Sequence, residues 1–207
     1  MKGLLSLIIL LLLASCKSVL TTENQCNLDS VDYKIYSMLL DKYVLPEIDS
    51  TMSFDEKNEK ISYIKNPRRN LLLIDSTRIY GKEDKESFSY LASDSSLLNS
   101  FIKRNINKCI LDSHFNNSIK LYRISRNSFD KYLSHNLISG YTDIYRVYKD
   151  VTGIVEFSKI GYNADRTKAL VEICLYRTPK NSFGLFIWLK FENGKWIIIG
   201  EKNDWVS

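Results

Sequence analysis

The chain has 207 residues, of which 44% are hydrophobic and 12% aromatic, and its formal net charge is +5. This composition is typical of one folded domain, because it supplies enough apolar side chains for a core. The Lys and Arg residues are spread among acidic residues instead of forming a basic stripe, so we expect no nucleic-acid partner. Glycine is scarce, at eight residues, and the sequence has no glycine-rich phosphate loop, so we expect no nucleotide cofactor.

The first 15 residues have the layout of a bacterial signal peptide. A short positive segment, residues 1–3, precedes a nearly unbroken apolar run at residues 4–13, which is too short for a membrane span of about 20 residues. Residues 13–16, Leu-Ala-Ser-Cys, resemble the lipobox of bacterial lipoproteins, in which the cysteine sulfur takes a diacylglycerol. We therefore expect removal of residues 1–15, lipidation of Cys16, and a domain anchored at the membrane of the bacterial envelope, outside the cytoplasm. An ordinary secretory signal, with Cys16 as a bystander, is the alternative.

Three cysteines remain once Cys16 is lipidated, and a compartment outside the cytoplasm permits disulfides. Cys174 sits inside an apolar strand pattern, so we expect a buried free thiol there. Cys26 and Cys109 are then the one candidate pair, and the sequence leaves open whether they join. No two of these cysteines fall at metal-ligand spacing, with each other or with the two histidines, so we expect no metal site.

Residues 16–27 are polar, and we expect them to form the tether between the lipid and a single α+β domain at residues 28–207. Two helices are predicted in the first half of this domain. One begins with Asp29 as its N-cap and ends before Pro46, because its apolar residues recur at helical spacing between these two signals. The second occupies residues 94–105 and also opens on an aspartate.

The segments around these helices carry weaker patterns. Residues 49–69 are polar and charged, which favours a loop, whereas residues 71–80 are predicted to form a strand. A helical turn is expected near Phe129, and the tyrosines of residues 141–148 recur at the spacing of a further helix.

From Gly153 onward the hydrophobic period changes to two, which indicates β-strands. Turn-forming residues divide this part into four runs, so we expect an antiparallel meander. Asn193 and Gly194 are typical of a type I′ hairpin turn, because both residues tolerate positive φ. The four predicted strands span residues 154–160, 167–177, 183–192 and 195–206. The predicted pairs across the last hairpin are Phe191 with Trp196, Leu189 with Ile198, and Ile187 with Gly200.

The opposite face of this hairpin is also apolar. If helices cover one face, the other must be covered by curling of the sheet or by something bound. We therefore take Trp188, Phe186 and Tyr145 as candidate binding residues on a concave face, and the alternative is that each is ordinary core. The apolar residues of this face and the tyrosines expected beside it are Phe186, Trp188, Ile197, Ile199, Tyr141, Tyr145 and Tyr148.

Residues 157–171 read FSKIGYNADRTKALV, residues 192–196 read ENGKW, and the last three residues are Trp-Val-Ser. Together these segments resemble the carboxyl-terminal half of an uncharacterised group of small lipoproteins and exported proteins from Bacteroidetes-type bacteria. The resemblance implies N-terminal helices packed on a curved C-terminal antiparallel meander of four or more strands, similar to the cystatin-like or nuclear-transport-factor-like rolls. It implies no activity. The group often has a cysteine- and glycine-rich segment where this chain has residues 176–181, so a role carried there is absent here.

No catalytic nucleophile stands out, because the sequence has no Gly-x-Ser-x-Gly motif and no cysteine with an obvious histidine partner. We expect a noncatalytic binding or interaction module, whose partners are the membrane, through the N-terminal lipid, and an envelope protein or a small ligand. The alternative is a hydrolase with a pocket inside the roll, using His114 or a buried carboxylate. A deep polar pocket with a perturbed titratable group favours the enzyme, and a shallow or apolar one favours the binding module.

Overall fold

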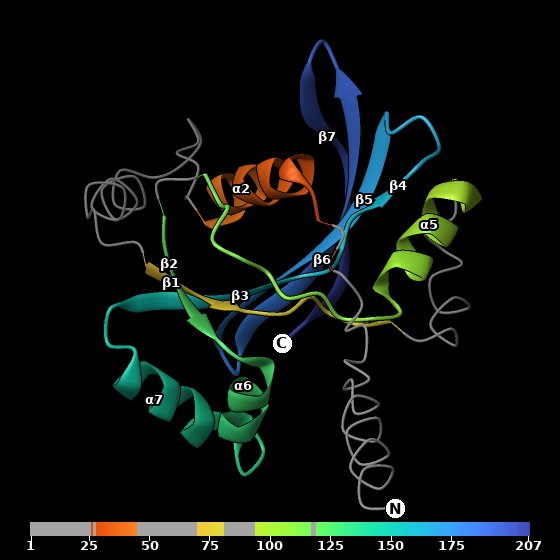
Figure 1. The fold of residues 1–207 in the computed structure, drawn as a ribbon. Helices are drawn as coiled ribbons and strands as arrows, with labels where there is room; N and C mark the ends of the chain where they lie inside the picture. The colour runs from red at the N-terminus through yellow and green to blue at the C-terminus, as the bar shows by residue number, and fades with distance from the viewer. Residues whose placement is uncertain (1–25, 27, 45–69, 81–93, 117–118) are drawn as a thin grey trace, which may run out of the picture.

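The computed structural model describes residues 26, 28–44, 70–80, 94–116 and 119–207, and its fold is α+β, as predicted (Figure 1). The signal peptide, Cys16 and the loop at 49–69 lie outside the described residues. The elements are α2 (Ser30–Val44), β1 (Asn70–Ile74), α5 (Ser95–Asn105), β2 (Lys120–Ile124), α6 (Arg126–Leu133), α7 (Leu137–Val147), β3 (Val151–Phe157), β4 (Gly161–Tyr162), β5 (Lys168–Thr178), β6 (Asn181–Glu192) and β7 (Lys195–Val206).

The seven strands form one mixed open sheet in the order β2-β1-β3-β5-β6-β7, with β4 beside β5. Strands β3, β5, β6 and β7 pair antiparallel, which confirms the predicted meander. Strand β1 instead runs parallel to both of its neighbours, β2 and β3. Parallel neighbours need long crossover connections. The connection from β1 to β2 carries α5, and the connection from β2 to β3 carries α6 and α7.

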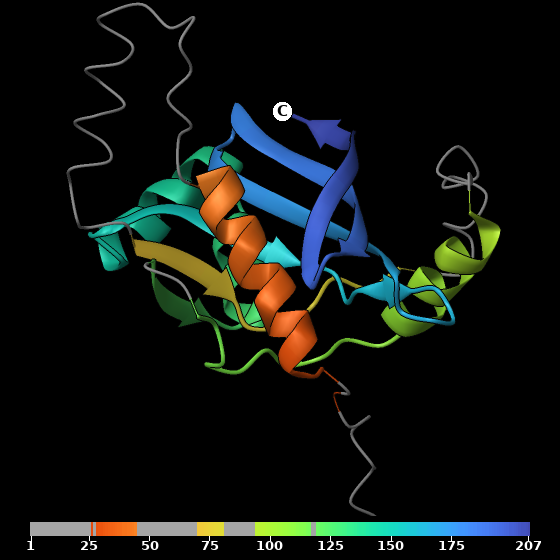
Figure 2. The same ribbon diagram turned by 90° about the horizontal axis from the view of Figure 1, so that it is seen from above.

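Helices lie on both faces of the sheet. Helix α2 crosses one face (Figure 2) and buries Ile35, Tyr36 and Leu39 against β3, β5 and β6. On the other face α5 packs over β5 and β6, while α6 and α7 pack over β1, β2 and β3 (Figure 1). Gly161 of β4 lets α5 approach, because a Cβ at this position would lie 2.5 Å from the backbone of Phe101.

Helix α2 begins as its sequence predicts. Oδ1 of Asp29 accepts hydrogen bonds from the backbone N–H groups of Val31, at 2.8 Å, and Asp32, at 3.1 Å. Oδ2 of Asp32 accepts in return from the backbone N–H of Asp29, at 2.9 Å. This reciprocal arrangement satisfies N–H groups that a helix start leaves without an intrahelical partner.

Two segments differ from the sequence predictions. Strand β2 was not predicted. It lies at the sheet edge, and its Lys120 and Arg123 are both exposed. The predicted strand at 71–80 ends at Ile74. Residues 75–80 then run beside residues 105–111, because the backbone N–H of Thr77 donates to the carbonyl of Cys109 and that of Leu111 to Asp75, both at 2.8 Å.

The last hairpin turns at Asn193 and Gly194, whose φ angles are 51° and 78°, as a type I′ turn requires. The predicted pairs of Phe191 with Trp196 and of Leu189 with Ile198 are confirmed. The predicted pair of Ile187 with Gly200 is wrong. Gly200 pairs with Trp188, and Ile187 pairs with Glu201, because the register shifts by one residue after Leu189 and leaves Ile199 as a β-bulge.

A disulfide joins Cys26 to Cys109, so the one candidate pair is formed. The two Cα atoms lie 5.0 Å apart, and the bond links residues 83 positions apart in the chain. Cys174 is a buried free thiol, as expected. In the part of the chain that the structure describes, no helix is long and apolar enough to cross a membrane.

Candidate functional site

The structure places the three candidate binding residues in two separate clusters. Phe186 is fully buried under α5, where its ring centroid lies 5.7 Å from that of Phe101. Trp188 is partly buried at the margin of the same cluster. Tyr145 lies on α7, at the other end of this sheet face, and its hydroxyl donates a 2.7 Å hydrogen bond to the carbonyl of Arg177. These residues therefore do not share one cavity.

The apolar face of the hairpin is covered only in part. Helix α5 covers Phe186, but Ile197 is 40% exposed and Ile199 is 54% exposed. A Cβ at Gly200 would lie 3.7 Å from the ring of Trp188, so this side chain lies over Gly200 of β7, the strand that carries the two isoleucines. We call Trp188, Ile197 and Ile199 the hairpin surface. The hairpin that carries it extends beyond the helices (Figure 1).

Two glutamates are buried on the sheet face that carries α5 and α6. Glu156 of β3 is 1% exposed, and Glu172 of β5 is 0% exposed. Arg126, at the start of α6, forms an ion pair with Glu156, and Arg78 lies 3.5 Å from Oε1 of Glu172. These two glutamates were not predicted as site residues from the sequence. The available signal was an acid at an inward-facing position of an otherwise apolar strand.

Burial raises the pKa of Glu172 to about 8, against the opposing effect of the nearby Arg78. The Cys174 thiol donates to Oε1 of Glu172 at 3.3 Å, and Arg78 donates to the sulfur at 3.0 Å. Burial also raises the pKa of the Cys174 thiol. At neutral pH both groups are therefore held protonated, and a protonated, buried thiol is a poor nucleophile. This cluster fits a structural role better than a catalytic one.

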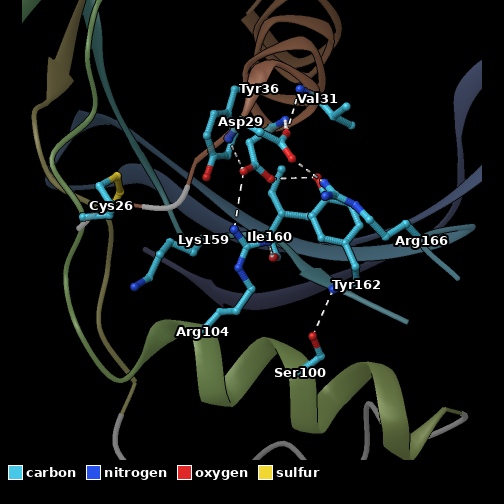
Figure 3. A network of polar contacts seen from close by, with 12 residues as sticks. Cys26, Asp29, Val31, Tyr36, Ser100, Arg104, Lys159, Ile160, Tyr162 and Arg166 are labelled. Carbon is cyan, nitrogen blue, oxygen red and sulfur yellow. Dashed lines mark hydrogen bonds and ion pairs between the residues drawn. A yellow bond between two sulfur atoms is a disulfide. The ribbon is translucent and has the colours of Figure 1, made fainter. Parts of the chain in front are cut away.

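A second polar network joins α2 to α5 and to the turn before β5 (Figure 3). Asp32 is fully buried and accepts a 2.7 Å hydrogen bond from the Tyr162 hydroxyl, while Arg104 lies 3.4 Å from its other oxygen. Arg166 lies over the ring of Tyr162 at 4.3 Å and forms a 2.8 Å ion pair with Asp29. Burial raises the pKa of Asp32, and Arg104 opposes this shift. The network fixes the start of α2, close to the point where Cys26 joins the domain.

His114 lies between α5 and β2, where its Nδ1 contacts a carboxylate oxygen of Asp112. A shallow groove of about 380 Å³ beside this pair is also lined by Tyr33 and Lys34 of α2. The His114 side chain is 72% exposed, so it lies on the outside of the fold. An Asp–His pair of this kind can act as a general base. Within the described residues, no group of three or more His, Cys, Asp or Glu side chains is placed to hold a metal ion.

Comparisons with protein-family models, with curated proteins and with solved structures find no match to this chain. The resemblance of residues 155–207 to the Bacteroidetes-type lipoproteins therefore stays a prediction. Three places on the described part of the protein have geometry that bears on function: the hairpin surface, the Asp112–His114 groove, and the region of the Cys26–Cys109 disulfide.

Proposed function

We propose that this chain is an envelope lipoprotein, lipidated at Cys16, whose domain lies outside the cytoplasm and acts as a noncatalytic binding module. The Cys26–Cys109 disulfide supports the location, because disulfides form and persist mainly in oxidising compartments outside the cytoplasm. The curved antiparallel meander supports a cystatin-like or nuclear-transport-factor-like roll as the architectural class, with the parallel strands β1 and β2 as an addition to it.

One observation carries the binding role. The hairpin surface keeps Ile197 and Ile199 in water beside a partly buried tryptophan, although α5 covers the neighbouring Phe186. Exposed apolar side chains gathered around an aromatic anchor are typical of protein interfaces. The bulge at Ile199 disrupts the regular ladder of the edge strand β7, which disfavours binding by simple strand addition. The partner is therefore an envelope protein or a small ligand that contacts these side chains directly.

The anchor is tested with Cys16→Ser. The unchanged chain should be recovered with membranes and carry the mass of the lipid on its first mature residue. The variant should be released from membranes or stay unprocessed. Equal membrane recovery and equal mature mass for the two proteins would rule out lipidation at Cys16.

The binding role is tested by photo-crosslinking in intact cells. A benzoylphenylalanine in place of Ile199 should give a discrete adduct, whereas the same residue in place of Lys149, which follows α7, should not. Adding Ile197→Ser to the Ile199 probe should abolish the adduct without lowering the melting temperature, because Ile197 is largely outside the core. Equal adducts at both probe positions, or an adduct that survives Ile197→Ser, would contradict binding through the hairpin surface.

The contact between Asp112 and His114 favours a second candidate, a hydrolase that uses His114 as its base. This candidate predicts that the purified chain cleaves ester substrates at a rate that falls at least tenfold in His114→Ala. Because His114 is exposed, the variant should fold normally. A rate that is the same in both proteins would exclude a catalytic role for His114.

A further inference from the structure

Two segments meet where the chain enters the domain. Residues 75–80 and 105–111 lie side by side, and three backbone hydrogen bonds between them have lengths of 2.8 to 3.0 Å. Cys109 belongs to the second segment and is bonded to Cys26, which is exposed. The covalent entry point of the N-terminal tether is therefore fixed against these two segments.

Both segments expose large apolar side chains. Ile79 is 52% exposed, Ile106 is 40% exposed, and Ile110 is 53% exposed. Ile110 directly follows Cys109, and its carbonyl oxygen lies 3.4 Å from the sulfur of Cys26. Ile79 precedes Tyr80, whose backbone N–H donates to the carbonyl of Asn105. The three isoleucines therefore lie on two hydrogen-bonded segments, one of which carries the disulfide.

The same region is basic. Lys103, in the last turn of α5, and Lys108 are both exposed. Lys159 is held beside them, because its backbone N–H donates to the side chain of Asn105 at 2.7 Å and its carbonyl accepts from the same side chain at 2.8 Å. In Figure 3 the Lys159 side chain extends away from the polar network, on the side of the view where Cys26 lies.

The tether is short, so a lipid on Cys16 would keep this region close to a membrane. Cys26 follows Cys16 by only ten residues, and ten extended residues span at most about 33–36 Å. A folded domain of this size is itself about 40 Å across. A lipid on Cys16 would therefore keep the surface around Cys26 near the bilayer at all times, which gives even weak contacts a high effective concentration.

We propose that the surface around the disulfide docks onto the bilayer itself, a proposal that rests on the lipidation of Cys16. Ile79, Ile106 and Ile110 enter the headgroup boundary, and Lys103, Lys108 and Lys159 contact the phosphates of anionic phospholipids. The domain is then held in one orientation, with the Cys26–Cys109 bond at the membrane.

The test is lysine acetylation of the mature, full chain in vesicles of phosphatidylcholine and phosphatidylglycerol at a ratio of 3:1. Mass spectrometry follows the rate at each lysine, with Lys149 and Lys195 as internal controls far from the region in sequence. In the vesicles, Lys103 and Lys108 should react several-fold more slowly than they do in a variant with Ile79→Ser, Ile106→Ser and Ile110→Ser. The control lysines should react equally in both proteins.

A matched variant, Ile197→Ser with Ile199→Ser, removes exposed isoleucines from the hairpin instead and should keep the protection. Equal rates at Lys103 and Lys108 in all three proteins would overturn the docking. Protection that disappears when the protein is diluted in the membrane would show that a second copy, and not lipid, covers the surface, and this result would also overturn it. An unchanged melting temperature checks that each variant is folded.

The mass of the N-terminal peptide separates this proposal from the one on which it rests. If Cys16 carries no lipid, the anchor has failed and the docking fails with it. If Cys16 carries lipid but the three serine substitutions leave the rates at Lys103 and Lys108 unchanged, the docking alone has failed.

Discussion

The hydroxyl of Tyr162 donates a 2.7 Å hydrogen bond to Oδ1 of Asp32, across 130 residues of sequence. Both ends of this contact are buried, so it links the first turn of α2 to β4 inside the protein. Helix α2 therefore holds its position through a specific polar contact as well as through its apolar face.

Tyr162→Phe should destabilise the fold, because it leaves a buried carboxylate oxygen without its donor. We expect a loss of about 1–3 kcal/mol in the free energy of unfolding, measured by urea denaturation. Tyr122→Phe, on the edge strand β2, is the matched control and should change stability by no more than about 0.5 kcal/mol. Equal effects of the two substitutions would show that the contact with Asp32 contributes nothing specific.

Glu172 should make stability fall as the pH rises. Its pKa is about 8 in the folded protein against an ordinary value of 4.5, so between these values the folded state binds a proton that the unfolded state has lost. Glu172→Gln removes this proton exchange. As the pH rises from 5 to 8, the free energy of unfolding of the variant should therefore increase relative to that of the unchanged protein. Urea denaturation at several pH values measures this difference.

Glu201→Gln supplies a control of opposite sign. The ion pair with Lys42 helps to hold the pKa of Glu201 below its ordinary value. This carboxylate therefore contributes stability that is present above its unfolded pKa and is lost as the pH falls through its folded pKa. A pH dependence that is identical in the unchanged protein and in Glu172→Gln would mean that Glu172 is ionised in the folded state.

Gly194→Val should destabilise the last hairpin by about 1 kcal/mol or more, because a β-branched residue resists positive φ. No atom lies within 4 Å of a Cβ at this position, so the cost would come from the backbone alone. Gly200→Ala is the control, since its Cβ would make ordinary contact with Trp188 at 3.7 Å. Thermal melting compares the two variants, and an unchanged melting temperature for Gly194→Val would contradict the turn.

Removing the disulfide with Cys26→Ser and Cys109→Ser should cost about 2–4 kcal/mol, because a bond across 83 residues restricts the unfolded chain. Dithiothreitol should lower the stability of the unchanged protein by a similar amount and leave the double variant unaffected. If the reductant destabilises the double variant equally, its effect does not come from this bond.

Substitutions at Phe186 and Ile199 should lower stability by different amounts, because one residue is in the core and the other is on the surface of the same hairpin. Phe186→Ala should cost about 3–5 kcal/mol, because the ring is fully buried against α5. Ile199→Ser should stay within about 0.5 kcal/mol of the unchanged protein. Trp188→Ala should fall between them. Urea denaturation of the three variants measures the order, and a large loss for Ile199→Ser would place this residue in the core.

Local signals account for what the sequence predicted correctly. Asp29 caps α2 through atoms within three residues, and Asn193-Gly194 determines its turn without help from the rest of the fold. Strand β2 gave no such signal, because it has five residues and a mixture of exposed and half-buried side chains. Its pairing with β1 joins residues 50 positions apart, which no local pattern reports.

The candidate site was predicted less well, for a physical reason. The alternation of side chains along the two strands shows that both faces of the hairpin are apolar. Which of these residues a helix covers depends on how closely α5 approaches β4 at Gly161. The bulge at Ile199 also shifts the register in a way that alternation alone does not indicate. As a result, Phe186 is core and Ile199 is exposed, although the sequence grouped them together.

The packing of α2 has a consequence for how the protein is made. This helix is near the start of the chain, but its core partners include Ile187 and Leu189 of β6, near the end. A polypeptide leaves the ribosome with its N-terminus first, so the apolar side of α2 lacks part of its native contacts until β6 has been synthesised. Such contacts between distant parts of a chain slow folding and prolong the exposure of apolar surface, which promotes aggregation. The apolar side of α2 therefore stays partly exposed until the last strands of the sheet are in place.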